Sequence, residues 1–158
     1  MRIVLAGEES AGIRVLRKLV SQGHEIVGVC SRADRNESTA SVWGVAGRLG
    51  LRRWEAGKVS DPSFASTLMA TQPDVLLNVH SLHIVHSDVL GVPKWGAYNL
   101  HPGPLPRYAG MNAPSWAIYR GETSHGVTLH QMDSGIDTGA IVYEQEFSLR
   151  SNESALSL

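Results

Sequence analysis

Two stretches of this sequence concentrate side chains that can move protons or stabilise a developing charge. The first, Asn99 to Gly110, places an amide and an imidazole two residues apart at its start. Proline or glycine occupies four of the six positions from His101 to Pro106, which excludes a helix and removes backbone donors from a strand ladder. We therefore predict a stiff, irregular loop after a short strand over residues 96–99, and we expect it to hold Asn99 and His101 still.

The second stretch, Met132 to Gly139, is an acidic turn between two strand-like segments and supplies Asp133 and Asp137. We predict that the two loops meet and that Asn99, His101 and Asp137 form one catalytic group. A carboxylate beside an imidazole can assist proton transfer, and amide and imidazolium donors can stabilise an oxyanion. Each residue also has a plain structural interpretation when taken alone: an amide that ties the loop, a histidine bonded to backbone, and a turn former.

The elements that would position these side chains alternate between strands and helices. Short apolar or β-branched runs predict strands over residues 2–6, 25–31, 51–54 and 75–79. Helical spacing predicts a helix that opens at 7–10 and closes at 22–23, and further helices over 39–49, 61–71 and 113–119. Alternating side chains predict two late strands, over 125–132 and 139–147. This order indicates a Rossmann-like α/β fold, with a mixed, mostly parallel sheet and helices on both faces.

Two of these elements carry more detailed expectations. We expect Asp61 to cap the helix over 61–71, and Phe64, Leu68 and Met69 to lie on its apolar side. In the strand over 125–132, the side chains at 127, 129 and 131 should point one way, and those at 128, 130 and 132 the other.

Composition limits the class of protein. The chain has 158 residues, 42% hydrophobic and 18% charged, as expected for one soluble globular domain. A formal net charge of −1 provides no basic surface for nucleic acid or an anionic membrane. The single cysteine, Cys30, lies in an apolar run and cannot form an internal disulfide, so we expect a core residue and a cytoplasmic location.

The two ends of the chain carry expectations of their own. The N-terminal residues turn polar too soon for a signal peptide or a membrane span. Residues 151–158 begin like a helix that stops after about one turn, which is unstable by itself. We therefore expect the chain to be a fragment truncated at its C-terminus.

A nucleotide site is one alternative chemistry, because Gly7 and Gly12 flank the first strand–helix turn and Arg32 follows the second strand. An NADP-dependent reductase would use these positions. However, the fingerprint lacks its third glycine, and Glu8 and Glu9 put negative charge where a pyrophosphate would bind. A plain strand–helix turn is the favoured interpretation.

Other candidate sites are weaker. His80, His83 and His86 share a spacing of three residues, but the stretch offers only Asp88 as a further metal ligand, so we expect loop histidines and no metal. No Gly-x-Ser-x-Gly elbow is present, and nucleophilic catalysis therefore lacks its nucleophile. Arg107 could bind a substrate phosphate or carboxylate through its guanidinium fork, or it could be a solvated loop residue.

The two loops contain three patterns of spaced residues: Asn99-x-His101-Pro102, Leu105-Pro106-x-Tyr108-x-Gly110, and Asp133-x-Gly135-x-Asp137-x-Gly139-x-Ile141. Together they resemble the formyltransferase family, which uses 10-formyltetrahydrofolate. That family includes glycinamide ribonucleotide transformylase, methionyl-tRNA formyltransferase, sugar N-formyltransferases and the formylation domains of non-ribosomal peptide synthetases. The resemblance covers nearly the whole chain and implies a formyltransferase catalytic domain over residues 1–158.

The resemblance also implies which residues carry the reaction. The family's catalytic asparagine, histidine and aspartate fall on Asn99, His101 and Asp137. The folate cosubstrate would contact two segments, the first made of Leu82, His83, Ile84 and Val85, the second of Asp133, Ser134, Gly135 and Ile136. The first segment would use backbone groups and the second would close over the pterin. His80 and His83 depart from the more apolar segment that is common in the family.

The implied reaction is attack of a neutral amine on the formyl carbon, with a tetrahedral intermediate stabilised by Asn99 and His101 and with proton transfer assisted by Asp137. No metal is expected. The acceptor side would include Arg107, Gly110, Met111 and Asn112, and residues 110–116 are similar to peptide-synthetase formylation domains.

The acceptor itself stays open at this point. It would be an amino acid on a carrier protein, an amino sugar or an aminoacyl-tRNA, and further domains of the same polypeptide would be partners. A hydrolase that releases formate from the same cosubstrate and a non-catalytic folate-binding remnant also stay open.

Overall fold

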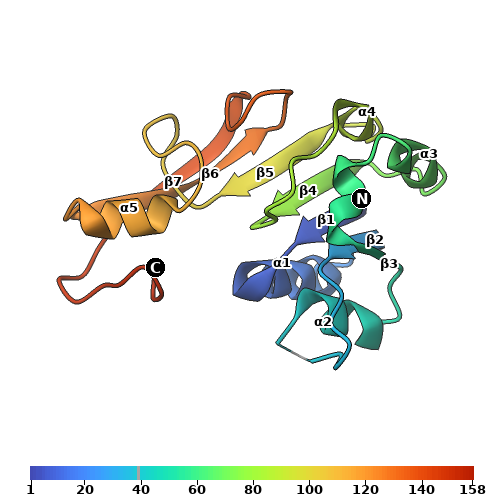
Figure 1. Ribbon diagram of the computed structural model, residues 1–158, viewed down its shortest axis with the longest axis horizontal. Coiled ribbons are helices and arrows are strands. Elements are labelled where there is room, and N and C mark those ends of the chain that lie inside the picture. The colour runs from blue at the N-terminus through green and yellow to red at the C-terminus, as the bar shows by residue number, and fades with distance from the viewer. Residues whose placement is uncertain (39) are drawn as a thin grey trace. The chain divides into compact units, whose positions relative to one another are not determined.

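The computed structural model describes residues 1–38 and 40–158 of the chain (Figure 1). These residues form two compact units, Met1–Tyr98 and Asn99–Leu158. Thr39, which begins the helix predicted over 39–49, lies outside the described residues.

The first unit is built on parallel strands. β1 (Arg2–Gly7), β2 (Glu25–Ser31), β3 (Arg53–Glu55) and β4 (Val75–Val79) lie in the order β3-β2-β1-β4, and each neighbouring pair runs parallel. The central side chains are apolar and fully buried, among them Val4, Leu5, Val29 and Leu76. This is the usual composition of strands that are covered on both faces. Cys30 is buried with them, and its burial raises the pKa of the thiol to about 12, which confirms its role as a core residue.

Helices cover these strands on both faces. α1 (Glu9–Ser21) and α2 (Val42–Arg48) lie side by side, in the crossovers from β1 to β2 and from β2 to β3 (Figure 1). α3 (Phe64–Met69) belongs to the crossover that returns from β3 to β4, past β2 and β1. Because such crossovers are right-handed, this change of direction places α3 on the opposite face.

The second unit contains the late strands. β5 (Ala97–His101) leads into it from the first unit. There β5, β6 (Ser124–Gln131) and β7 (Ile141–Ser148) follow in that order, and β6 and β7 run antiparallel. α5 (Ala113–Tyr119) follows the proline-rich loop with the predicted bounds. Parallel strands early and an antiparallel pair late confirm the predicted α/β fold with a mixed, mostly parallel sheet.

The structure differs from the predicted elements mainly at their ends. α2 begins at Val42 because the Ser41 hydroxyl accepts the Gly44 N–H at 3.1 Å and caps the helix there. β5 continues to His101, since a residue that precedes proline favours extended backbone. Two short helices, η1 (Ala56–Ser60) and α4 (Ser87–Leu90), have no counterpart among the predicted elements, and residues 151–158 form turns.

The α3 helix corrects two expectations. Asp61 does not cap it, because Asp61 Oδ1 accepts the backbone N–H and the hydroxyl of Ser63, at 2.9 and 2.7 Å, in a turn before the helix. Phe64 and Leu68 are buried as predicted, whereas Met69 is 62% exposed. A surface helix buries only one stripe, and Met69 lies outside that stripe.

The side chains of β6 alternate as predicted, and the buried face is the one that carries Thr128 and His130. Thr128 is fully buried and His130 is 2% exposed. Burial of polar side chains is costly unless they find hydrogen-bond partners. This face of β6 therefore binds neighbouring polar groups instead of filling an apolar core.

Candidate active site

Asn99 and His101 lie at the end of β5, where the proline-rich loop begins. Their spacing of two residues puts both side chains on one face of the strand. His101 is buried, and its Nε2 lies 2.6 Å from the carbonyl oxygen of Tyr108. Because a carbonyl oxygen only accepts hydrogen bonds, Nε2 carries the hydrogen and Nδ1 is left to face the rest of the cluster.

Asp137 joins this pair from the acidic loop between β6 and β7. Its Oδ2 lies 3.3 Å from His101 Nδ1 and accepts the Gly110 N–H at 2.8 Å, and its Oδ1 lies 3.3 Å from Asn99 Nδ2. The Asp137 side chain is only 11% exposed, and its backbone adopts a left-handed φ of 54°. Such strained non-glycine residues cluster at functional sites. The structure thus brings Asn99, His101 and Asp137 together within the second unit.

A fourth residue, His130, completes the cluster and is absent from the predicted site. Its Nε2 lies 3.1 Å from Asn99 Nδ2 and 3.3 Å from Asp137 Oδ1. Its Nδ1 lies 2.9 Å from the carbonyl oxygen of Gln131. Strand alternation places position 130 on one face of β6, but only the folded structure shows that this face is buried and brings His130 to the cluster.

Side chains of β6 also hold the backbone of the proline-rich loop. The Thr128 hydroxyl accepts the Leu105 N–H at 3.2 Å and donates to the Gly103 carbonyl at 2.8 Å. His125 Nε2 lies 2.9 Å from the Pro102 carbonyl oxygen. Buried backbone groups need partners, and here β6 provides them. Proline stiffens the loop, and Thr128 and His125 anchor it.

The acidic loop is shaped by Asp133. Its Oδ1 accepts the Thr138 hydroxyl at 2.7 Å and the Gly135 N–H at 2.9 Å. These two hydrogen bonds, the Thr138 bond first, hold the pKa of the Asp133 carboxyl below its usual value. The predicted folate-contacting residues of this loop are exposed, including Ile136 at 63%.

The other predicted folate segment belongs to the first unit. Leu82, His83 and Ile84 are exposed, whereas Val85 is buried in the core of that unit. The Ser60 hydroxyl, at the end of η1, donates to the Ile84 carbonyl at 2.6 Å and anchors the backbone of the segment. The segment thus offers exposed apolar side chains at Leu82 and Ile84 and an anchored backbone.

The residues predicted for the acceptor side differ in their contacts and in their exposure to solvent. Arg107 pairs with Glu122 and lies over the ring of Tyr108, 5.3 Å from its centroid. The Tyr108 hydroxyl, followed by Arg107, holds the pKa of the Glu122 carboxyl below its usual value. Gly110 donates to Asp137, as described above, and Met111 is 70% exposed. Asn112 precedes α5 with a left-handed φ of 60°.

The turn considered for a dinucleotide contains a side-chain carboxylate. Glu8 Oε1 accepts the Arg32 N–H at 2.6 Å, and Glu8 Oε2 accepts the Ser31 hydroxyl at 3.3 Å. A carboxylate at the start of α1 suits the helix dipole and opposes a phosphate. This contact favours the plain strand–helix turn.

Two of the three histidines considered for a metal lie beside nearby polar groups of the first unit. His80 Nδ1 lies 3.7 Å from Glu9 Oε2, and His86 Nδ1 accepts the Asp88 N–H at 3.2 Å. Among residues 1–38 and 40–158, no group of three histidine, cysteine or acidic side chains is arranged to hold a metal ion. None of the helices in this described part of the chain has the length and apolar character that a membrane span requires.

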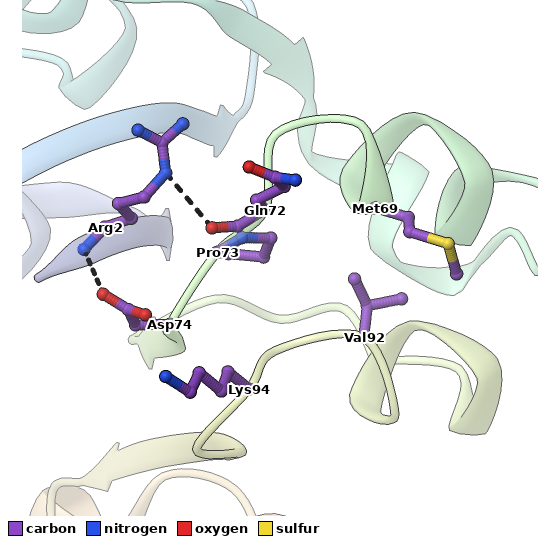
Figure 2. Close-up of a pocket in the computed structure, with 7 residues that line it drawn as sticks. All are labelled: Arg2, Met69, Gln72, Pro73, Asp74, Val92 and Lys94. Atoms are coloured by element: carbon purple, nitrogen blue, oxygen red, sulfur yellow. Dashed lines mark hydrogen bonds between the residues drawn. The ribbon is translucent and has the colours of Figure 1, made fainter.

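The first unit also contains a pocket of about 410 Å³ near the amino-terminal ends of β1 and β4 (Figure 2). Arg2, Met69, Gln72, Pro73, Asp74, Val92 and Lys94 line it. Figure 2 shows the Arg2 backbone N–H donating to Asp74 and Arg2 Nε donating to the Gln72 carbonyl. Ligands of open α/β sheets bind at the opposite, carboxyl ends of the strands. The cluster around Asp137 is therefore the better candidate for chemistry.

Comparison with known proteins agrees with the motifs. The family model described as formyl transferase matches residues 1–158. The methionyl-tRNA formyltransferases of Pelotomaculum thermopropionicum and Anaeromyxobacter dehalogenans are 30% and 32% identical to this chain over 161 and 166 residues. These alignments cover 98% and 100% of this chain but 51% and 53% of the two relatives. The chain thus spans about half the length of the curated relatives it matches.

Solved structures share the fold. Phosphoribosylglycinamide formyltransferase from Bacillus halodurans has a TM-score of 0.82 at 20% identity, covering 99% of this chain and 84% of that one. The N-formyltransferase from Helicobacter canadensis, in complex with folinic acid and dTDP-3-aminofucose, has a TM-score of 0.72 at 18% identity, covering 99% of this chain and 55% of that one. The match over residues 1–158 and the identity to these relatives lead to one conclusion: the chain belongs to the formyl transferase family.

Proposed function

We propose that this chain transfers a formyl group from 10-formyltetrahydrofolate to a primary amine. The observation that carries the proposal is the contact of one carboxylate, Asp137, with both the imidazole of His101 and the amide of Asn99. Membership of the formyl transferase family supports the same reaction. In that reaction the amine nitrogen bonds to the formyl carbon, and the bond from this carbon to the folate nitrogen then breaks.

His101 and Asp137 are suited to move the proton. The Nε2 hydrogen of His101 is held by the Tyr108 carbonyl, so Nδ1 faces the Asp137 carboxylate. This contact is attractive only when a hydrogen lies between the two atoms. We infer that the pair delivers that proton to the departing folate nitrogen and regains one from the attacking amine, which is general acid–base catalysis.

Asn99 is suited to stabilise the oxyanion. Its Nδ2 faces two acceptors, His130 Nε2 at 3.1 Å and Asp137 Oδ1 at 3.3 Å. We infer that the developing oxyanion replaces Asp137, the more distant acceptor, as the tetrahedral intermediate forms. Hydrogen bonds that reach their final geometry only with substrate bound are common in enzymes. A preorganised donor of this kind contributes about a hundredfold or more to the rate.

The substrate contacts follow from the resemblance and from exposure. For the cosubstrate we propose backbone groups of residues 82–85 and the turn of residues 133–136, and the exposure of most of these residues within their own units supports this. For the acceptor we propose Arg107 and residues 110–112. Arg107 would have to exchange Glu122 for an anionic group of the acceptor.

The test is to incubate the chain with 10-formyltetrahydrofolate and measure release of tetrahydrofolate with each of several amines. Methionyl-tRNA is included because the relatives are named for it, and a nucleotide-linked amino sugar because one structural neighbour is described in complex with one. A carrier-bound amino acid completes the panel. Tetrahydrofolate that appears with one amine only supports the transferase and names its acceptor class. Release without any amine would instead identify a formate-releasing hydrolase.

The matched variants are Asp137→Asn in the cluster and Asp88→Asn on the surface, where the side chain is 61% exposed. We expect Asp137→Asn to lower turnover about a hundredfold or more, because it removes a proton-transfer group. We expect Asp88→Asn to match the unsubstituted chain. Normal turnover by Asp137→Asn would refute the assigned role of Asp137.

A further inference from the structure

His130 is a buried titratable group to which the mechanism above gives no task, and its hydrogen positions can be worked out from its neighbours. Nδ1 lies 2.9 Å from the Gln131 carbonyl oxygen, which can only accept. Nδ1 therefore carries a hydrogen. Nε2 faces Asn99 Nδ2 at 3.1 Å, and an amide nitrogen can only donate. Nε2 lies nearer to this donor than to Asp137 Oδ1 at 3.3 Å, so we assign to Nε2 the lone pair that accepts from Asn99, which makes His130 neutral in this arrangement.

We propose that His130 is a positioning residue for Asn99 in formyl transfer. Neutral His130 accepts one hydrogen of the Asn99 amide and fixes the orientation of the amide group. The second hydrogen, which faces Asp137 Oδ1, is the one left to exchange with the oxyanion. The proposal rests on the proposed function, and it assigns to His130 the task of holding the Asn99 amide in the orientation in which it can donate to the oxyanion.

Protonation of His130 would reverse this arrangement. A hydrogen on Nε2 is repelled by the Asn99 amide and attracted by Asp137 Oδ1, which lies 3.3 Å away. Asn99 would lose His130 as an acceptor, and Asp137 Oδ1 would accept the new hydrogen of His130. The charged or titratable groups that face His130 are Asp137 and, through its ring edge, His101, with the Asp133 carboxylate acting by charge alone. The active form is therefore the deprotonated one, and the rate should fall as the pH falls.

Two substitutions separate the two roles of the imidazole. In His130→Gln the amide oxygen can stand in for Nε2 as an acceptor for Asn99, but it cannot take up a proton. In His130→Asn the amide can keep the bond to the Gln131 carbonyl, but the shorter side chain does not reach Asn99. The matched control is His24, changed in the same two ways, because its side chain makes no hydrogen bond or ion pair within the described part of the chain.

We expect His130→Asn to lower kcat about ten- to a hundredfold, with little change of KM for 10-formyltetrahydrofolate, because the Asn99 amide loses the acceptor that orients it. We expect His130→Gln to keep kcat near the unsubstituted value above neutral pH and to lose the part of the acid-side decline that belongs to His130. The His24 variants should leave kcat and its pH profile unchanged. A kcat and pH profile unchanged in both His130 variants would overturn the proposal.

A second readout does not depend on turnover. Nitrogen NMR of the labelled chain should show His130 protonated on Nδ1 alone at neutral pH, and the Asn99 amide signals should shift with the same midpoint as His130 on acidification. In His130→Gln that shift of Asn99 should disappear. A hydrogen on Nε2 at neutral pH, or an Asn99 amide indifferent to His130, would refute the positioning role. Absence of turnover with every amine, by contrast, would refute the proposed function itself.

Discussion

Thr128 is the residue whose substitution should show most clearly how β6 holds the proline-rich loop. Its hydroxyl accepts the Leu105 N–H at 3.2 Å and donates to the Gly103 carbonyl at 2.8 Å, and the residue is fully buried. Thr128→Val keeps the shape of the side chain and removes both hydrogen bonds. The Leu105 N–H and the Gly103 carbonyl then stay buried without a partner.

The magnitude follows from these two groups. Each buried polar group left unpaired costs about 1–3 kcal/mol, so Thr128→Val should destabilise the fold by about 2–6 kcal/mol. For a chain of this length, that corresponds to a fall of the unfolding midpoint by roughly 4 °C or more. The loop that carries His101 should also lose its fixed position, so turnover should fall in the molecules that remain folded. Misplacement of a catalytic group by about 1 Å can cost about a hundredfold in rate.

The assay is denaturant unfolding followed by circular dichroism, together with turnover measured well below the transition. Thr123→Val is the matched control, because Thr123 is exposed on the same segment and its substitution should change stability by less than about 0.5 kcal/mol. Thr128→Ser, which keeps the hydroxyl, should lose only about 0.5–1.5 kcal/mol for the missing methyl group. Equal stability of Thr128→Val and Thr123→Val would refute the reasoning.

Two further predictions concern the proline-rich loop and the acidic loop. A Cβ at Gly103 would lie 2.9 Å from the Ala113 side chain, so Gly103→Ala should destabilise the fold by about 1–3 kcal/mol through overpacking. Gly91→Ala is the control, because a Cβ there would lie 3.7 Å from its nearest neighbour, and it should leave the midpoint of the same unfolding assay unchanged. Equal midpoints would contradict the packing argument. Thr138→Val should raise the pKa of Asp133 toward its usual value, measured by carbon NMR of the carboxyl. Because the pKa of Asp133 is lower in the folded chain than in the unfolded chain, its hydrogen bonds stabilise the turn above the unfolded-state pKa. This stabilisation is lost as the pH falls through the folded-state pKa. An Asp133 titration that is unchanged by the substitution would rule out the Thr138 bond as the main cause of the lowered pKa.

Much of the fold could be predicted from the sequence because its signals are local. Apolar runs at 2–6, 25–31 and 75–79 become buried parallel strands with nearly the predicted bounds. The weaker predictions concern short elements. η1 and α4 contain five and four residues, and helices of that length form only when tertiary contacts support them. Met69 shows the same limit, since helical spacing does not reveal how wide a stripe the sheet will cover.

The candidate site likewise has features that the sequence predicts and features that only the folded chain shows. The motif and the spacing of Asn99 and His101 are properties of the sequence, because a strand places positions two apart on one face whatever surrounds it. The meeting with Asp137 was predicted from the residue types of the two loops and from the resemblance, and the distances between these side chains exist only in the folded unit.

The burial of His130 and Thr128 was determined by tertiary structure alone. The sequence determined that they share a face of β6, but not that this polar face would be the buried one. Apolar patterning predicts the inward face only when burial is driven by removal of apolar surface from water. Here the polar side chains of the buried face find partners in the backbone groups of the proline-rich loop and in the Asp137 carboxylate. Hydrogen bonds between residues so distant in sequence have no local signature, because their donors and acceptors meet only once the chain has folded.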